Sequence, residues 1–280
     1  MLLSRIVRSA LKRPRAAVAD PQVPFDVAVV VQTVLRPSLE RAVRSVFTQR
    51  FEGRVQVLVG VDKRLGNAGI VDRLAAECPA HMHLTAFDPG YSTSARYGSQ
   101  YANFFGGGMR TILSYAANSR LVAYLDDDDW FAEEHLETLR SAIEGKSWAF
   151  SLRWYVNPAN LEPMCLDTIE SVGPGKGIYA ERFGGFVCPS TLMLDKMRCH
   201  FILPYWCQAM GPKGNGEDRV VFEALRTRFP DDYGASGKGT SYYVVNVEDG
   251  MYPVRERFIA ASGYDISRLP KNAAGAPRRA

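Results

Sequence analysis

Apolar and polar residues alternate along the chain with two periods from residue 26 onward, one typical of strands and one typical of helices. Apolar runs at residues 27–31, 55–61 and 121–125 predict strands that are buried on both faces. After the first run, apolar residues recur at spacings of three and four, which predicts a helix with a single apolar face. That face consists of Leu39, Ala42, Val43, Val46 and Phe47, and Ser38 stands where an N-cap residue would.

Further segments of both kinds divide the chain into two halves. In residues 26–147 we expect a helix at 70–76, a strand at 83–87, a loop at 89–108, a helix at 108–117 that buries Ile112, Leu113 and Ala116, and a helix at 130–143. In residues 148–269 we expect strands at 148–156 and 191–194 and a helix at 217–229. This alternation predicts a single α/β domain with a mostly parallel central sheet covered by helices, in a Rossmann-like arrangement. Ligands of such sheets bind at the carboxyl ends of the strands.

The charge of the chain is concentrated at its start. The formal net charge is +4, and five positive residues precede the first acid, so residues 16–280 carry a net charge of about −1, four minus five. A body without excess positive charge is not expected to bind nucleic acid. Residues 1–20 combine those charges with apolar residues at helical spacing, which fits either a solvated end or a helix that contacts anionic lipid through residues 1–19. Residues 270–280 lack an apolar pattern and are expected to be disordered.

The five cysteines and the apolar runs limit the cellular setting. An odd number of cysteines without a CxxC pair argues against a disulfide framework and against a structural zinc site, and fits a reducing cytoplasm. No apolar stretch reaches eighteen residues, so no membrane-spanning helix is expected. We therefore expect a cytoplasmic protein that is soluble or peripheral to the inner face of the membrane.

Four consecutive aspartates, Asp126 to Asp129, follow the apolar run LVAYL. Adjacent carboxylates repel one another, so a cation is expected among them, and Mg²⁺ and Mn²⁺ prefer such oxygen ligands. The alternative is the start of a helix, where acidic residues are favourable, and Asp129 in particular fits that role. A single helix start does not require four acids, so we favour a metal site.

Four pieces of the sequence resemble the family 2 glycosyltransferases, over roughly residues 26–230. The segment VQTVLRPSL, residues 31–39, is similar to the family's opening strand and turn. LDDDDW, residues 125–130, with the following Glu134, is similar to its aspartate motif, and Arg110 precedes Asp126 by the sixteen positions typical of a family arginine. Gly216-Glu217-Asp218, before a predicted helix, resembles its ED motif.

The resemblance implies a GT-A fold, a nucleoside-diphosphate sugar as donor, with a UDP-sugar favoured, and inversion at the anomeric carbon. Carried over by motif, it implies that Asp126 lies near the ribose and the metal, with Asp127 beside it, that Asp128 is the direct ligand of Mn²⁺ or Mg²⁺, and that Asp218 is the catalytic base. It further implies a nucleotide site formed by Thr33, Arg36, Asp62 and Arg110. Two departures bear on the choice of nucleotide, because Leu35 replaces the usual asparagine and VDKRL at residues 61–65 replaces VDDGS.

The chemistry of glycosyl transfer agrees with these assignments. A metal and an arginine stabilise a departing diphosphate, and a carboxylate can accept the proton of an attacking hydroxyl. On the acceptor side we consider Glu217 as an orienting neighbour of Asp218, and Tyr205 and Trp206 as a platform for a sugar face. Each has a plainer interpretation, since acids open helices and aromatic residues often pack in cores.

Two other functions are compatible with parts of the pattern. A nucleotidyltransferase acting on sugar phosphates also uses metal-held aspartates, but it usually carries a glycine-rich segment after the first strand, which VQTVLRPSL lacks. A non-catalytic carbohydrate- or nucleotide-binding module would keep the fold without the base. For an enzyme, a carbohydrate or lipid-linked acceptor in bacterial surface polysaccharide or glycoconjugate synthesis is the expected partner.

Overall fold

The computed structural model describes residues 19–100, 103–211 and 215–270. The amphipathic segment expected at the start of the chain and the tail expected after residue 270 therefore lie outside the described residues, apart from their innermost positions. Within the described ranges, no helix is both long enough and apolar enough to cross a membrane.

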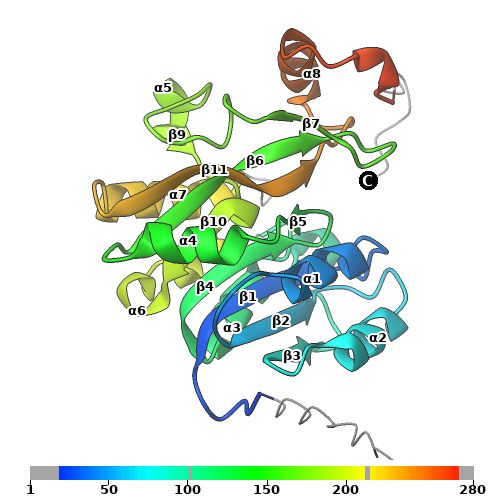
Figure 1. Ribbon diagram of the computed structural model, residues 1–280, viewed down its shortest axis with the longest axis vertical. Helices are drawn as coiled ribbons and strands as arrows, with labels where there is room; N and C mark the ends of the chain where they lie inside the picture. Colours follow the sequence, from blue (N-terminus) through cyan, green and yellow to red (C-terminus); the bar gives the residue numbers. More distant parts are fainter. Residues whose placement is uncertain (1–18, 101–102, 212–214, 271–280) are drawn as a thin grey trace, which may run out of the picture.

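The first half of the chain forms the parallel part of a central sheet (Figure 1). Its strands are β1 (Phe25–Thr33), β2 (Val55–Val61), β3 (Met82–Phe87) and β4 (Ser119–Asp126), arranged in the order β3-β2-β1-β4. The connecting helices are α1 (Leu39–Phe47), α2 (Gly69–Glu77) and α3 (Gly107–Ala116). The three apolar runs are thus confirmed as strands. Asp62 lies directly after β2, and the four aspartates lie at the end of β4. Both positions are on the same edge of the sheet.

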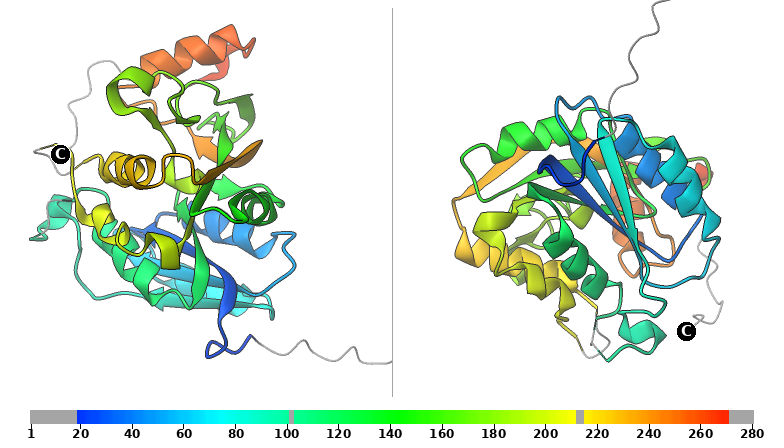
Figure 2. Two further views of the ribbon diagram at one scale, coloured as in Figure 1. Left: turned by 90° about the vertical axis from the view of Figure 1, so that its left-hand side faces the viewer. Right: turned by 90° about the horizontal axis from the view of Figure 1, so that it is seen from below.

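Helices cover both faces of this sheet (Figure 2), which explains why its strands are apolar at successive positions. Val27, Val29 and Val31 of β1 pack on the side of α1, α2 and α4 (His135–Ile143). Ala28 and Val30 pack on the opposite side, with α3 and α7 (Glu217–Arg228).

The second half continues the same sheet with mixed strand directions. β10 (Leu192–Asp195) is antiparallel to both β4 and β6 (Trp148–Val156), and β11 (Tyr233–Val244) is parallel to β6. β5 (Trp130–Phe131) and β7 (Pro163–Leu166) add antiparallel pairs. The α/β fold in a single domain is confirmed. The sheet is mixed, since β1 to β4 are parallel to one another, whereas the second half combines antiparallel pairs with the parallel pair β6–β11.

Smaller elements complete the second half. They are β8 (Gly173–Pro174) paired with β9 (Gly185–Phe186), α5 (Ala180–Phe183), α6 (Lys196–Cys199) and α8 (Tyr252–Ala261). Short 3₁₀ turns occur at Ala95–Tyr97, Pro189–Thr191, Leu203–Cys207 and Ile266–Arg268.

Three local predictions differ from the structure. Residues 130–143 do not form one helix, because Trp130 and Phe131 pair with β11 as β5 and the Trp130 ring stacks on Tyr242 at 5.0 Å. Asp129 therefore does not open a helix. Ser38 makes no side-chain capping bond at α1, since its own backbone is already helical.

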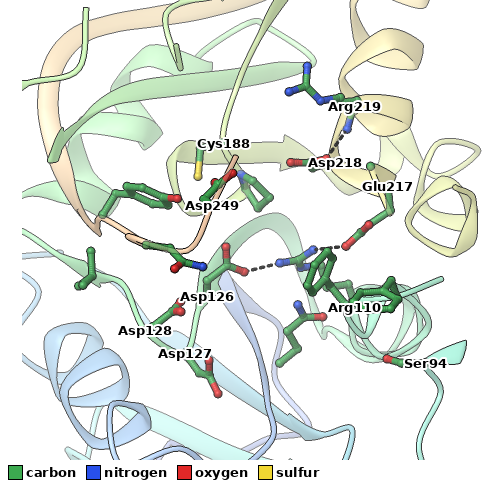
Figure 3. Close-up of a pocket in the computed structure, with 18 of the residues that line it drawn as sticks. Ser94, Arg110, Asp126, Asp127, Asp128, Cys188, Glu217, Asp218, Arg219 and Asp249 are labelled. Carbon is green, nitrogen blue, oxygen red and sulfur yellow. Dashed lines mark hydrogen bonds and ion pairs between the residues drawn. The ribbon is translucent and has the colours of Figure 1, made fainter. Parts of the chain in front are cut away.

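The buried face of α3 is rotated from the expected one. Ile112 and Ala116 are exposed, whereas Met109 and Leu113 are buried against β1 and β2. Gly60 of β2 permits this close approach, because a Cβ there would lie 2.3 Å from Cγ of Met109. The rotation also buries Arg110 and directs it toward the carboxyl ends of the strands (Figure 3).

Candidate active site

A cavity of about 500 Å³ lies at the carboxyl ends of β1, β2 and β4, and α7 and β11 form its other wall. It gathers nearly all the residues that the sequence analysis singled out, and Figure 3 shows several of them pointing into it. From that set, its lining contains Thr33, Arg36, Asp62, Arg110, Asp126, Asp127, Asp128, Glu217 and Asp218.

Asp127 faces the turn after β1. Its Oδ2 accepts hydrogen bonds from the Thr33 hydroxyl at 2.6 Å and the Val34 amide at 3.4 Å, and its Oδ1 lies 3.3 Å from Nη1 of Arg36. Burial raises the pKa of Asp127 to about 6 despite the nearby guanidinium. These contacts make Asp127 a support of the turn, and its contact with a nucleotide sugar stays a prediction.

The other three aspartates differ in exposure and neighbours. The Asp128 side chain is half exposed, and its Oδ2 accepts a hydrogen bond from Nη1 of Arg36 at 2.7 Å. Asp129 is buried, its Oδ2 has no hydrogen-bond partner in the described part of the chain, and burial raises its pKa well above the usual range. Ligand atoms of Asp126, Asp129 and Cys188 all lie within 4.8 Å of one another. Two of these three donors are carboxylates, the ligands that Mg²⁺ and Mn²⁺ prefer, whereas burial raises the pKa of the Cys188 thiol to about 12.

Arg110 connects the aspartates to α7. Its Nη2 donates a hydrogen bond to Oδ1 of Asp126, and its Nη1 lies 3.6 Å from Oε1 of Glu217. The guanidinium is buried and stacks over the ring of Trp206, with Cζ 4.9 Å from the ring centroid. Figure 3 shows the resulting chain of charges from Asp126 through Arg110 to Glu217.

Glu217 and Asp218 open α7 and have different surroundings. Glu217 is 3% exposed, its Oε2 has no partner among the described residues, and burial together with Asp218 raises its pKa to about 7. Asp218 is partly buried, lines the cavity and accepts a hydrogen bond from the amide of Arg219 at 2.8 Å. Burial raises the pKa of Asp218 as well. Both residues line the cavity, and Asp218 is the more exposed of the two.

The raised pKa of Glu217 gives a testable pH dependence. In the unfolded chain this carboxyl loses its proton near pH 4.5, whereas in the folded protein it keeps the proton until about pH 7. The folded state binds more protons in between, so unfolding free energy falls as pH rises through this window, by up to about 1.4 kcal/mol per pH unit. We expect Glu217→Gln to raise the melting temperature at pH 8 and to change it little at pH 4.

Glu223→Gln is the matched control for this experiment, since Glu223 lies on the same helix with its side chain 53% exposed. A Glu217→Gln variant with the same pH profile of stability as wild type would contradict the assignment.

Tyr205 and Trp206 lie outside the lining of this cavity, and the acceptor platform expected at them stays a prediction that this cavity does not support. Trp206 is 1% exposed and packs on Tyr124, with ring centroids 4.9 Å apart. Tyr205 packs beside the same core. The 3₁₀ turn at Leu203–Cys207 is held between α3 and α7, which directs both rings into the protein.

Asp62 is already bonded within the chain. Its Oδ1 accepts from the amide and hydroxyl of Thr93, at 2.7 and 2.6 Å, and its Oδ2 accepts from the hydroxyls of Ser92 and Ser94, at 3.0 and 2.6 Å. Asp62 thereby anchors the loop that borders the nucleotide half of the cavity. Recognition of a base by Asp62 remains a prediction, and a base bound there would share these oxygens with three side chains.

The sequence analysis missed the buried charges of the opposite wall. Glu170 accepts hydrogen bonds from Nη2 of Arg153 at 2.7 Å, from Nε of Arg255 at 2.9 Å and from the Tyr155 hydroxyl at 2.9 Å. Arg153, Glu170 and Arg255 all line the cavity. No motif marks them, because they come from three distant segments, and the single local signal is an arginine inside the apolar strand β6.

No protein-family model matches the chain, and no curated protein matches its sequence. Solved structures do match. The crystal structure of S. aureus TarS aligns with 84% of this chain and 39% of that chain, at 14% identity and a TM-score of 0.54. TarS 1–349 in complex with UDP-GlcNAc aligns with 85% of this chain and 66% of that chain, at 14% identity and a TM-score of 0.53. This chain thus spans less than two thirds of either TarS chain.

The likeness establishes a shared fold and confirms the GT-A-like expectation. A weaker alignment, with a TM-score of 0.48 and 16% identity, covers 94% of this chain and 70% of a mannosyltransferase from Pyrobaculum calidifontis in complex with GDP-Man and Mn²⁺.

Proposed function

We propose that the protein is a glycosyltransferase, which moves a sugar from a nucleoside-diphosphate sugar to an acceptor hydroxyl with inversion at the anomeric carbon. The observation that carries this proposal is a single cavity in which donor-type and base-type side chains from separate elements meet. They are Arg110 of α3, Asp126 and Asp128 at the end of β4, and Asp218 of α7. A UDP-sugar is the favoured donor, because TarS has been crystallised with UDP and with UDP-GlcNAc on the same fold.

The chain's own residues fit a divalent cation. Asp128 presents a half-exposed carboxylate to the cavity, and Asp126 and Asp129 bring ligand oxygens within 4.8 Å of each other. Asp126 and Asp128 are the predicted ligands of Mn²⁺ or Mg²⁺, which when bound supplies positive charge next to the diphosphate. Arg110 holds Asp126 in place and carries its own charge at the same spot, where it stabilises a departing diphosphate.

Asp218 performs the proton transfer in this proposal. As the acceptor oxygen bonds to the anomeric carbon, Asp218 takes the hydroxyl proton, the bond from that carbon to the phosphate oxygen breaks, and its electron pair leaves with the diphosphate. Attack from the side opposite to the diphosphate inverts the configuration. A raised pKa improves a carboxylate as a base, and burial raises that of Asp218.

Metal-dependent nucleotide binding tests the donor side. We expect UDP to raise the melting temperature of the wild-type protein with Mn²⁺ present, and more strongly than GDP, TDP or CMP. Asp128→Ala should abolish this metal-dependent rise while leaving the fold intact, because loss of a half-exposed carboxylate from a crowded cluster relieves repulsion. Calorimetric titration of UDP with and without Mn²⁺ gives the affinities.

Asp127→Asn is the matched control, since it changes the adjacent residue, whose bonds to Thr33 and Val34 face away from the other aspartates. This variant should lose stability but keep metal-dependent binding. Loss of metal dependence in Asp127→Asn with its retention in Asp128→Ala would assign the metal to Asp127 and Asp129 instead.

A further inference from the structure

Six arginines line the cavity, and four of them are neutralised by carboxylates. Arg36 pairs with Asp127 and Asp128, Arg110 with Asp126 and Glu217, and Arg153 and Arg255 with Glu170. For Arg96 and Arg219, no carboxylate of the described residues lies within ion-pair distance. All 30 aspartates and glutamates of the sequence lie in the described ranges, so no acidic side chain escapes this comparison.

Aromatic rings hold the guanidinium of Arg219. Its Cζ lies 4.2 Å from the ring centroid of Tyr179, 4.3 Å from that of Phe183 and 5.3 Å from that of Phe186. Nη1 of Arg219 is buried without a hydrogen-bond partner in the described part of the chain. Ring faces fix the position of a guanidinium and leave its charge available, unlike the carboxylates that pair with the other four arginines.

The position of Arg219 separates it from the predicted donor groups. It follows Asp218 directly at the start of α7, and Figure 3 shows both on the side of the cavity opposite to Asp127 and Asp128. Arg219 also lines a second cavity of about 420 Å³ and is the one residue, among those described, shared by the two linings. Arg182 and Arg226 line that second cavity too, together with Glu181 and Glu223, and Glu223 pairs with Arg226. Arg219 therefore contributes to both cavities and directly follows Asp218 in the chain.

We propose that Arg219 forms a subsite for an anionic group, a phosphate or a carboxylate, carried by the acceptor. The inference rests on the proposed glycosyl transfer and narrows its acceptor class. An arginine fork matches both anions through paired N–H donors, and a buried donor without a partner is costly until such a group arrives. Because Arg219 adjoins Asp218, the anion holds the acceptor while its hydroxyl faces the base.

Binding of inorganic phosphate to protein saturated with UDP and Mg²⁺ tests the subsite without turnover, because UDP occupies the donor's own phosphate site. We expect phosphate, or acetate as the carboxylate probe, to bind wild type and to bind Arg219→Ala roughly 10- to 100-fold more weakly, measured by NMR titration of the probe. Arg219→Lys should keep part of the affinity. Arg228→Ala is the matched control on α7, since Arg228 lies over Phe201 and outside both cavities.

Turnover with paired acceptors identifies the anion. Two pairs of acceptors are compared, glycerol with glycerol 3-phosphate and methyl glucoside with methyl glucuronoside. The rate of UDP release from the donor is measured with each acceptor. The anionic member of one pair should have the higher kcat/KM, and Arg219→Ala should remove that preference without changing UDP affinity. Failure of wild type to bind either probe, or equal binding by Arg219→Ala, overturns the subsite. If wild type binds the anion but releases no UDP from the donor with any of these acceptors, the proposed glycosyl transfer is overturned instead.

Discussion

The Asp218→Asn variant is expected to transfer sugar about 10²- to 10⁴-fold more slowly than wild type, the usual contribution of a positioned base. Asparagine keeps the size of the side chain and can still accept the hydrogen bond from the Arg219 amide, so α7 should start at the same residue. What is lost is the ability to take the acceptor's proton. The measurement is kcat with saturating donor and acceptor, together with UDP affinity, which should not change.

Glu217→Gln is the matched control, because Glu217 is adjacent but only 3% exposed, with its Oε1 3.6 Å from Nη1 of Arg110. It should reduce kcat less than Asp218→Asn. A larger effect of Glu217→Gln would transfer the role of base to Glu217, whose pKa near 7 suits proton transfer at neutral pH. A product of retained anomeric configuration would refute direct displacement altogether.

The largest loss of stability is expected for Glu170→Ala. Glu170 is 1% exposed and accepts hydrogen bonds from two buried arginines and two tyrosine hydroxyls. Without it, Arg153 keeps Asp167 and Arg255 keeps Asp249, but each guanidinium loses a buried partner. Removing one member of a buried ion pair costs about 3–5 kcal/mol, because the remaining charge stays out of water.

Urea denaturation of Glu170→Ala and of Glu162→Ala compares the loss of unfolding free energy for a buried ion pair with that for an exposed one. Glu162 also pairs with an arginine, Arg268, at 2.7 Å, but both side chains are about half exposed. Its loss should cost below about 1 kcal/mol, the usual range for surface pairs. Equal losses in the two variants would show that the Glu170 network does not stabilise this wall of the cavity.

The sequence by itself determined the parts of the protein whose signal is local. β1, β2 and β4 were predicted because strands covered on both faces are apolar at successive positions, a pattern that needs no knowledge of partners. The aspartates were placed correctly for the same reason, since they follow such a strand directly. The start of α7 was recognised from Glu217 and Asp218, with glycine before them and an apolar face after them.

Only the tertiary structure decided features that depend on distant neighbours. β11 contains three glycines and an apolar run only at its end, and it is a strand along its length because β6 and β5 pair with its two edges. At Gly239 a Cβ would lie 2.3 Å from Cδ1 of Leu166, so the glycine that weakens the local strand signal is the residue that lets β11 approach the side chains of β6 and β7.

Contacts between segments that are distant in the sequence also form the cavity. The burial of Trp206 against Tyr124, the contacts of Glu170 with Arg255, and the rings around Arg219 join segments that are separated along the chain. A periodic pattern reports only which face of an element is buried, not which charge or ring of another element meets it there. The sequence therefore contained the candidate metal ligands and base, while folding alone decided which arginines of the cavity are paired with carboxylates and which, Arg96 and Arg219, are not.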